Sequence, residues 1–143
     1  MVLKNRNKNA TLGAINHSRY LYIKMNIEIH QRGETKIAEL SSQGFLITNA
    51  EDGLQLLVDL YYQGFDKIIL SQENITASFF DLQNGLAGEI LQKFSNFRVQ
   101  LAIVGEFDQY PSKSLKQFIS ESNNGNQVNF LATAEEAKEK LFR

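Results

Sequence analysis

Residues 66–107, DKIILSQENITASFFDLQNGLAGEILQKFSNFRVQLAIVGEF, decide the fold. Two apolar runs, residues 68–70 and 99–104 (the latter interrupted by Gln100), lie near the ends of this stretch, and such near-continuous runs are typical of parallel strands buried on both faces. Between them, apolar side chains recur at spacings of three and four, as on one side of a helix: Phe79, Leu82, Leu86, Ile90, Leu91 and Phe94. The stretch therefore predicts a strand, a helix and a second strand joined by a right-handed crossover.

A β-hairpin is predicted before this unit. Residues 26–30 alternate polar and apolar side chains, residues 36–40 form a second short run, and Gly33 between them can supply the positive φ of a tight turn. One face of the hairpin should therefore pack on the core. On this pattern His30 shares the other, outward set with Glu28, so we expect a solvated histidine.

Further helices and one more strand complete the expected fold. Capping residues and apolar stripes predict helices after Asn49, Ser112 and Thr133, and residues 127–131 indicate a short strand. In the first of these helices we expect Tyr61 to lie in the core. The order β-β-α-β-α-β-α-β-α predicts an α/β fold, with a mixed sheet whose central strands are parallel.

Size and composition indicate one globular domain. The chain has 143 residues, of which 43% are hydrophobic, so we expect a single α/β domain over residues 25–143. The chain has no cysteine, which excludes disulfides and thiolate ligands and fits a reducing compartment. It shows neither the apolar region of a signal peptide nor an apolar run of about 18 residues that would span a membrane. A cytoplasmic protein without a membrane segment is therefore expected.

Charge is unevenly distributed along the chain. Residues 1–24 contain five of the 15 basic side chains and no acid, which leaves 10 basic against 16 acidic side chains in the rest. That acidic body argues against a nucleic-acid groove, because phosphate binding depends on Lys and Arg. We expect residues 1–24 to be a mobile basic extension, or the product of an upstream start, with Met25 opening the first strand.

No catalytic constellation stands out. The chain lacks G-x-S-x-G and H-E-x-x-H motifs, and His17 and His30 are its only histidines. We therefore expect no enzyme, no cofactor and no metal site. The alternative is a metal-dependent hydrolase or transferase that uses four loop carboxylates, Glu73, Asp81, Glu106 and Asp108.

Polar side chains gather where the parallel strands are expected to end. In open α/β sheets, ligands and partners meet the loops beyond the carboxyl ends of the strands. The candidate binding residues in these loops are Ser71, Glu73, Asn74, Thr76, Glu106, Asp108, Tyr110 and Ser112. The same residue types also suit ordinary capping of turns and helices.

The segment Asn84-Gly85-Leu86-Ala87-Gly88 supplies further candidates. Small residues at a helix start let backbone N–H groups approach an anion. The segment lacks the Lys-Ser/Thr pair of a P-loop and the G-x-G-x-x-G of a dinucleotide turn, so Gly88 is interpreted as a site of close packing between helix and sheet. Asn84, Gly85 and Gly88 remain candidate binding residues.

The run ITASFFDLQNGLAGEILQKFSNFRVQLAIVGEF, followed by SKSLKQFISESNNGNQVNF, resembles a family of small bacterial proteins known as domain of unknown function 4180. The resemblance covers residues 25–142 and implies no activity. A homodimer through an apolar surface is one further expectation, with Phe45, Tyr62 and Phe142 as candidates.

The order of elements also resembles, more distantly, the anti-sigma factor antagonist (STAS) domains. In that family a helix opens with a Ser-Gly-Leu-Gly-like turn, whose hydroxyl residue is phosphorylated by a partner kinase to switch binding. Asn84 stands at this position and accepts no phosphate, so a switch would use Thr76 or Ser78. The resemblance implies a non-enzymatic binding or regulatory module that engages a protein partner or small ligand through residues 71–88 and 106–112.

Overall fold

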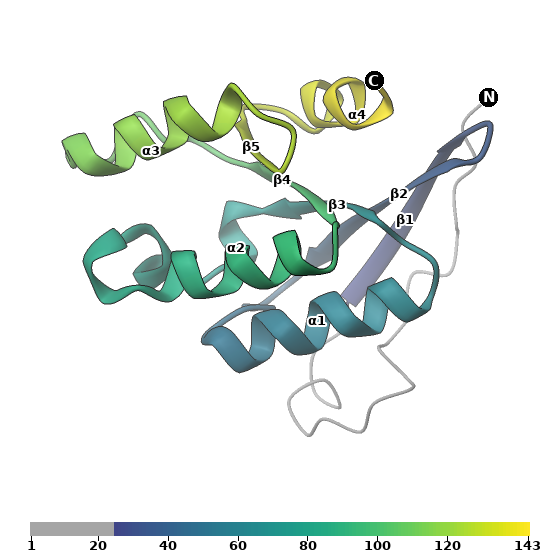
Figure 1. Ribbon diagram of the computed structural model, residues 1–143, viewed down its shortest axis with the longest axis horizontal. Coiled ribbons are helices and arrows are strands. Elements are labelled where there is room, and N and C mark those ends of the chain that lie inside the picture. The colour runs from purple at the N-terminus through teal and green to yellow at the C-terminus, as the bar shows by residue number, and fades with distance from the viewer. Residues whose placement is uncertain (1–24) are drawn as a thin grey trace.

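The computed structural model describes residues 25–143 and has a five-stranded sheet at its centre (Figure 1). The strands are β1 (Met25–Arg32), β2 (Thr35–Ser42), β3 (Lys67–Ser71), β4 (Gln100–Val104) and β5 (Val128–Leu131), and they lie side by side in that order. β1 and β2 are antiparallel, whereas β2, β3, β4 and β5 are parallel to one another. The predicted α/β fold with a mixed sheet is confirmed; the expected extension at residues 1–24 lies outside the described residues.

Helices cover both faces of this sheet. The described chain contains α1 (Ala50–Tyr62), α2 (Leu86–Asn96), α3 (Lys113–Asn123) and α4 (Ala134–Phe142). α1, α2 and α3 each connect neighbouring parallel strands, and their buried side chains join one core cluster, as successive right-handed crossovers require. α4 packs on the opposite face, away from α1 and α2 (Figure 1). Within residues 25–143 no helix is long and apolar enough to cross a membrane.

The central strands are buried on both faces, as their continuous apolar runs predict. In β3, Ile68 and Leu70 face the cluster formed with α1, α2 and α3, and Ile69 between them faces α4. All three side chains are at most 2% exposed. Because successive side chains of a strand point to opposite faces, an apolar residue is needed at each position.

The connection from β3 to α2 is not one continuous helix; the sequence left open whether residues 75–82 form a separate short helix. Three 3₁₀ turns, Gln72–Asn74, Ala77–Phe80 and Leu82–Asn84, precede α2, which begins only at Leu86. Gly85 has φ of 78°, a left-handed conformation that interrupts a helix and that glycine adopts at little cost. Phe79 is therefore buried from a separate turn rather than from the helix that carries Phe94.

The face that α1 buries also differs from the expectation. Tyr61 is 42% exposed, whereas Leu56 and Leu60 are fully buried. Gly53 lies on the buried side, where an added Cβ would be 3.1 Å from Cγ1 of Ile90 in α2. The helix has leucine or valine at five positions on more than one side, so its periodicity alone did not select the buried face.

Close packing at Gly88 is likewise not observed. Gly88 is exposed on α2, and an added Cβ there would meet no atom within 4 Å. The glycine that permits close approach between α1 and α2 is Gly53. The expectation for Gly88 is therefore wrong.

Candidate functional site

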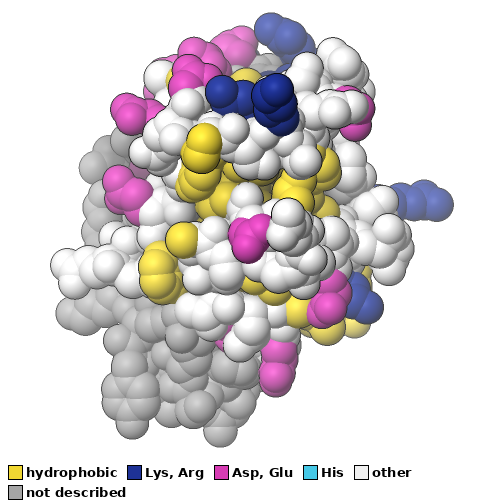
Figure 2. All heavy atoms as spheres, turned by 90° about the vertical axis from the view of Figure 1, so that its left-hand side faces the viewer, with side chains coloured by type: hydrophobic (Ala, Val, Ile, Leu, Met, Phe, Trp, Pro, Cys, Tyr) yellow, Lys and Arg dark blue, Asp and Glu magenta, His cyan; other side chains and the backbone are white. Residues whose placement is uncertain are grey.

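A pocket of about 610 Å³ opens at the carboxyl ends of β3 and β4. Its walls come from the turns after β3, from the loop between β4 and α3, and from Phe45 after β2. Figure 2 faces this end of the molecule, where hydrophobic side chains gather in the centre and acidic side chains lie close to them. The position agrees with the general rule for ligand sites in open α/β sheets.

Gln72 joins the two loops that form the base of the pocket. Its Nε2 donates a hydrogen bond to the hydroxyl of Tyr110 at 2.6 Å, and its Oε1 accepts one from the backbone N–H of Glu106 at 2.9 Å. A Cβ on Gly105 would overlap the Gln72 amide and lie 2.6 Å from Gln72 Cβ, so only glycine fits there without movement. The two loops are therefore positioned together before any ligand binds.

An aromatic cluster forms one wall. The Phe80 and Tyr110 rings stack at 5.2 Å between centroids with an interplanar angle of 21°. Phe107 lies 5.9 Å from Phe80 and meets Phe130 of β5 edge to face at 5.3 Å. Such ring pairs add about 1 kcal/mol each beyond the area that they bury, which makes this wall rigid. Phe45, 45% exposed, adds a further apolar side chain to the lining.

The charged side chains of the described lining are acidic. Glu73 and Glu106 both line the pocket, together with uncharged polar groups from Ser71, Gln72 and Gln109. Among residues 25–143, no Lys, Arg or His contributes to this lining. The pocket therefore combines aromatic surface with negative charge.

Four of the candidate residues from the sequence line this pocket: Ser71, Glu73, Glu106 and Tyr110. Ser71 additionally accepts a hydrogen bond from the Glu73 backbone N–H at 3.2 Å, so it caps the first 3₁₀ turn. Gln72 was missed, because an amide gives no motif; the only available signal was its place directly after a strand.

Asn74 is structural rather than accessible. It is 3% exposed, and its Nδ2 donates hydrogen bonds to the carbonyls of Ser42 at 2.9 Å and Gly44 at 3.0 Å. Its own carbonyl accepts from the backbone N–H of Leu46 at 2.7 Å. Asn74 thus fixes the loop after β2 that carries Phe45. Ile47 in this loop makes an isolated parallel β-bridge to Ile75.

The remaining candidates do not line the pocket: Thr76, Asn84, Gly85, Gly88, Asp108 and Ser112. Asn84 accepts from the Leu86 N–H at 2.8 Å and donates to the Ser78 carbonyl at 2.7 Å, so it organises the start of α2. Ser112 accepts from the Leu115 N–H at 3.1 Å and caps α3. These contacts are capping chemistry at turns and helix starts.

The expectation of a solvated His30 is wrong. The residue is 1% exposed, and its Nε2 lies 2.7 Å from Oε1 of Glu39 on β2. His30 does point to the face opposite the main core, as the alternation predicted, but α4 packs on that face. Ile37, which pairs with His30 across the hairpin, is fully buried there in the same cluster as Leu141 of α4.

The loop carboxylates proposed for a metal-dependent enzyme do not come together. Within the described part of the chain, the one group of three or more His, Asp or Glu side chains close enough to hold an ion is Glu28, His30 and Glu39. The acids of the loops, Glu73, Asp81, Glu106 and Asp108, form no such group.

Comparison with known families gives one match. The profile of a family described as "Domain of unknown function (DUF4180)" matches residues 32–141. The chain belongs to this family. The DUF4180 match runs from the last residue of β1 into α4 and contains every residue that lines the pocket. No curated protein matches the chain, and the DUF4180 description states no activity, so function is argued from the geometry.

Proposed function

We propose that this protein is a non-enzymatic binding or regulatory module of STAS-like architecture, which holds an organic cation in the pocket at the ends of β3 and β4. The observation that supports this is the lining of the pocket. Two carboxylates, Glu73 and Glu106, lie beside an aromatic wall in a cavity of about 610 Å³. Cavities of roughly 300–1,000 Å³ are typical of small-molecule sites.

The chemistry of the lining favours a positive charge attached to an apolar body. A carboxylate attracts an ammonium or guanidinium group, and the face of an aromatic ring adds a cation–π contribution of about 1 kcal/mol at a partly exposed site. An anionic ligand would face Glu73 and Glu106 without a basic side chain from the described lining to receive it. The cation is either a free amine or a Lys or Arg side chain that a protein partner inserts.

The hydrogen bonds of the pocket support binding rather than catalysis. Gln72 and Tyr110 bond to each other, and Gln72 also holds the Glu106 backbone, so these groups position the loops. A nucleophile needs a base within hydrogen-bond reach that is itself oriented by a third group. The groups that line this pocket support no such arrangement.

Tyramine and 4-hydroxyphenylacetate test the proposal, because they share a phenol ring and carry opposite charges. Titration of the ¹⁵N-labelled protein should show saturable tyramine binding, with the largest amide shifts at Gly105, Glu106 and Tyr110. Glu106→Gln should weaken tyramine binding about fivefold through loss of one charge. Glu89→Gln, on the exposed side of α2, is the matched control and should leave it unchanged.

Two peptides distinguish a free amine from a partner side chain. A lysine-containing peptide and its acetyl-lysine form differ in one charge. If the lysine peptide binds more tightly than tyramine, and acetylation abolishes that binding, the cation comes from a protein partner. Preference for 4-hydroxyphenylacetate over tyramine, or shifts outside the pocket, would show that the proposal is wrong.

A further inference from the structure

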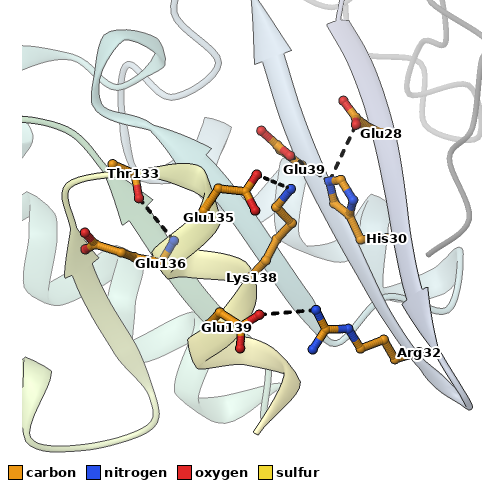
Figure 3. Close-up of polar contacts among 9 residues, drawn as sticks. All are labelled: Glu28, His30, Arg32, Glu39, Thr133, Glu135, Glu136, Lys138 and Glu139. Carbon is orange, nitrogen blue, oxygen red and sulfur yellow. Dashed lines mark hydrogen bonds and ion pairs between the residues drawn. The ribbon is translucent and has the colours of Figure 1, made fainter. Parts of the chain in front are cut away.

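We infer that the protein has a second site, for a divalent transition-metal ion such as Zn²⁺, at Glu28, His30 and Glu39 (Figure 3). The site lies on the hairpin of β1 and β2, on the face of the sheet where α4 packs. It shares no residue with the pocket, so it is independent of the proposed function. Glu28 and His30 also precede the part of the chain that the DUF4180 profile matches.

The register of the hairpin brings the three side chains together. Glu28 lies directly opposite Glu39, and His30 follows Glu28 by two residues, so all three project from the same face. His30 Nε2 is 2.7 Å from Oε1 of Glu39 and 3.8 Å from Oε1 of Glu28. One ligand atom from each residue lies within 4.8 Å of the others.

These separations suit a common ion. Zinc bonds to imidazole nitrogen and carboxylate oxygen are about 2.0–2.2 Å long, which puts neighbouring ligand atoms roughly 3–3.5 Å apart. The observed separations of 2.7 and 3.8 Å lie on either side of that range. Small rotations of the two glutamate side chains, which are 33% and 26% exposed, are enough to admit the ion.

The burial of His30 is the observation that points to a ligand rather than to a solvated acidic surface. The imidazole is held in a strand pairing of eight residues on each side, and Nε2 is directed between the two carboxylates. Nδ1 is buried and has no hydrogen-bond partner. Without a metal, Nε2 donates its proton to the Glu39 carboxylate; Zn²⁺ binding would move the ring proton to Nδ1 and give the Nε2 lone pair to the ion.

The two carboxylates supply the oxygen ligands of the site. Glu28 and Glu39 lie directly opposite one another on antiparallel strands, so both can reach the same ion. One buried and two half-exposed ligands also leave coordination positions open to water, as in metal sites that are not purely structural.

The charged side chains of α4 are engaged beside the site (Figure 3). Lys138 pairs with Glu135 at 2.7 Å, and Arg32 pairs with Glu139 at 3.2 Å. The hydrogen bond and charge of Lys138 lower the pKa of the Glu135 carboxyl, with a smaller contribution from His30. Glu135 therefore stays ionised, and its ion pair with Lys138 lies next to the site without adding a net charge.

Zn²⁺ titration of His30→Gln, with His17→Gln as the matched control, tests the inference. The sequence has no cysteine and only His17 and His30 as imidazoles, so a Zn²⁺ ion with a nitrogen side-chain ligand must use one of them. Calorimetric titration of the full chain should show one Zn²⁺ per molecule in the wild type and in His17→Gln. His30→Gln and Glu39→Gln should each weaken binding at least about tenfold. Mg²⁺, which prefers oxygen ligands, should bind much more weakly.

A direct readout covers the case in which His30→Gln does not fold. The ring ¹⁵N resonances of His30 in the wild type should shift on addition of one equivalent of Zn²⁺, while circular dichroism establishes that each variant is folded. Binding that survives in folded His30→Gln but disappears in His17→Gln would overturn the inference. So would His30 ring resonances that do not respond to Zn²⁺, or the lack of any saturable binding by the wild type.

Discussion

The pocket at the strand ends and the hairpin face under α4 both bury polar side chains, but they satisfy them differently. At the pocket, the Asn74 amide reaches two carbonyls, and the Gln72 amide uses both its nitrogen and its oxygen. On the hairpin, His30 uses one ring nitrogen and leaves the other without a partner. Buried polar groups are nearly always paired, so a paired set indicates a finished scaffold.

Gly105→Ala should have the largest effect, because it breaks the scaffold of the pocket. The new Cβ would lie 2.6 Å from Gln72 Cβ, so Gln72 must move and lose its bonds to Tyr110 and Glu106. We expect a loss of about 3 kcal/mol in the free energy of unfolding, measured by urea denaturation, together with loss of tyramine binding.

Gly88→Ala is the matched control for Gly105→Ala. Nothing lies within 4 Å of a Cβ at this position in α2, so alanine should stabilise the protein by about 0.7 kcal/mol through its higher helix propensity. Equal destabilisation by the two substitutions would mean that the clash with Gln72 is not what makes Gly105 necessary.

Asn74→Ala should cost somewhat less, about 2 kcal/mol in urea denaturation. It leaves the carbonyls of Ser42 and Gly44 without their donor in a partly buried loop. Because this loop carries Phe45, the pocket edge should also loosen, visible as faster amide exchange at residues 45–47. If Asn74→Ala left both the amide exchange at residues 45–47 and the free energy of unfolding unchanged, the Asn74 hydrogen bonds would not be what fixes this loop.

Asp59→Asn should have a smaller effect than Gly105→Ala and Asn74→Ala, and the opposite sign. Asp59 is 2% exposed in α1, its Oδ2 has no partner, and burial raises the pKa of its carboxyl above the ordinary 3.8. A raised pKa means that the folded state favours the protonated form, so stability is lost as pH rises through the folded pKa. Asparagine should therefore stabilise the protein by about 1 kcal/mol at pH 7.

The pH dependence of this gain checks its cause. The difference between Asp59→Asn and the wild type should shrink as pH falls through the raised folded pKa, and it should be smallest below the ordinary 3.8, where the carboxyl is protonated in both states. Asp108→Asn, at an exposed loop position, should show little change at either pH. A gain for Asp59→Asn that is constant with pH would exclude desolvation of the carboxylate as its origin.

Local sequence predicted the elements well where backbone chemistry is decisive. Gly33 has φ of 59° in the turn between β1 and β2, as the hairpin prediction required, and Asn49, Ser112 and Thr133 each cap a helix. The helix between β3 and β4 was predicted too long because its apolar spacing continues through Phe79. The interruption depends on the left-handed conformation of Gly85, which glycine permits but does not require.

The candidate site was predicted only in part. Ser71, Glu73 and Glu106 follow directly from the rule that ligands meet the carboxyl ends of parallel strands, and all three line the pocket. Asn74 belongs to the same loop and is buried instead, because its amide finds two carbonyls after β2. Which polar side chain of a loop turns inward depends on partners that are distant in sequence.

The sequence by itself determined the order of the elements and the two-sided burial of β3 and β4, because apolar periodicity and capping residues act over a few neighbouring positions. It also determined which face of the hairpin His30 occupies. Only the tertiary structure decided that this face is covered, since α4 reaches it from the other end of the chain. The tertiary structure likewise decided the hydrogen bond between Gln72 and Tyr110, because these residues are 38 positions apart and no local sequence pattern extends that far.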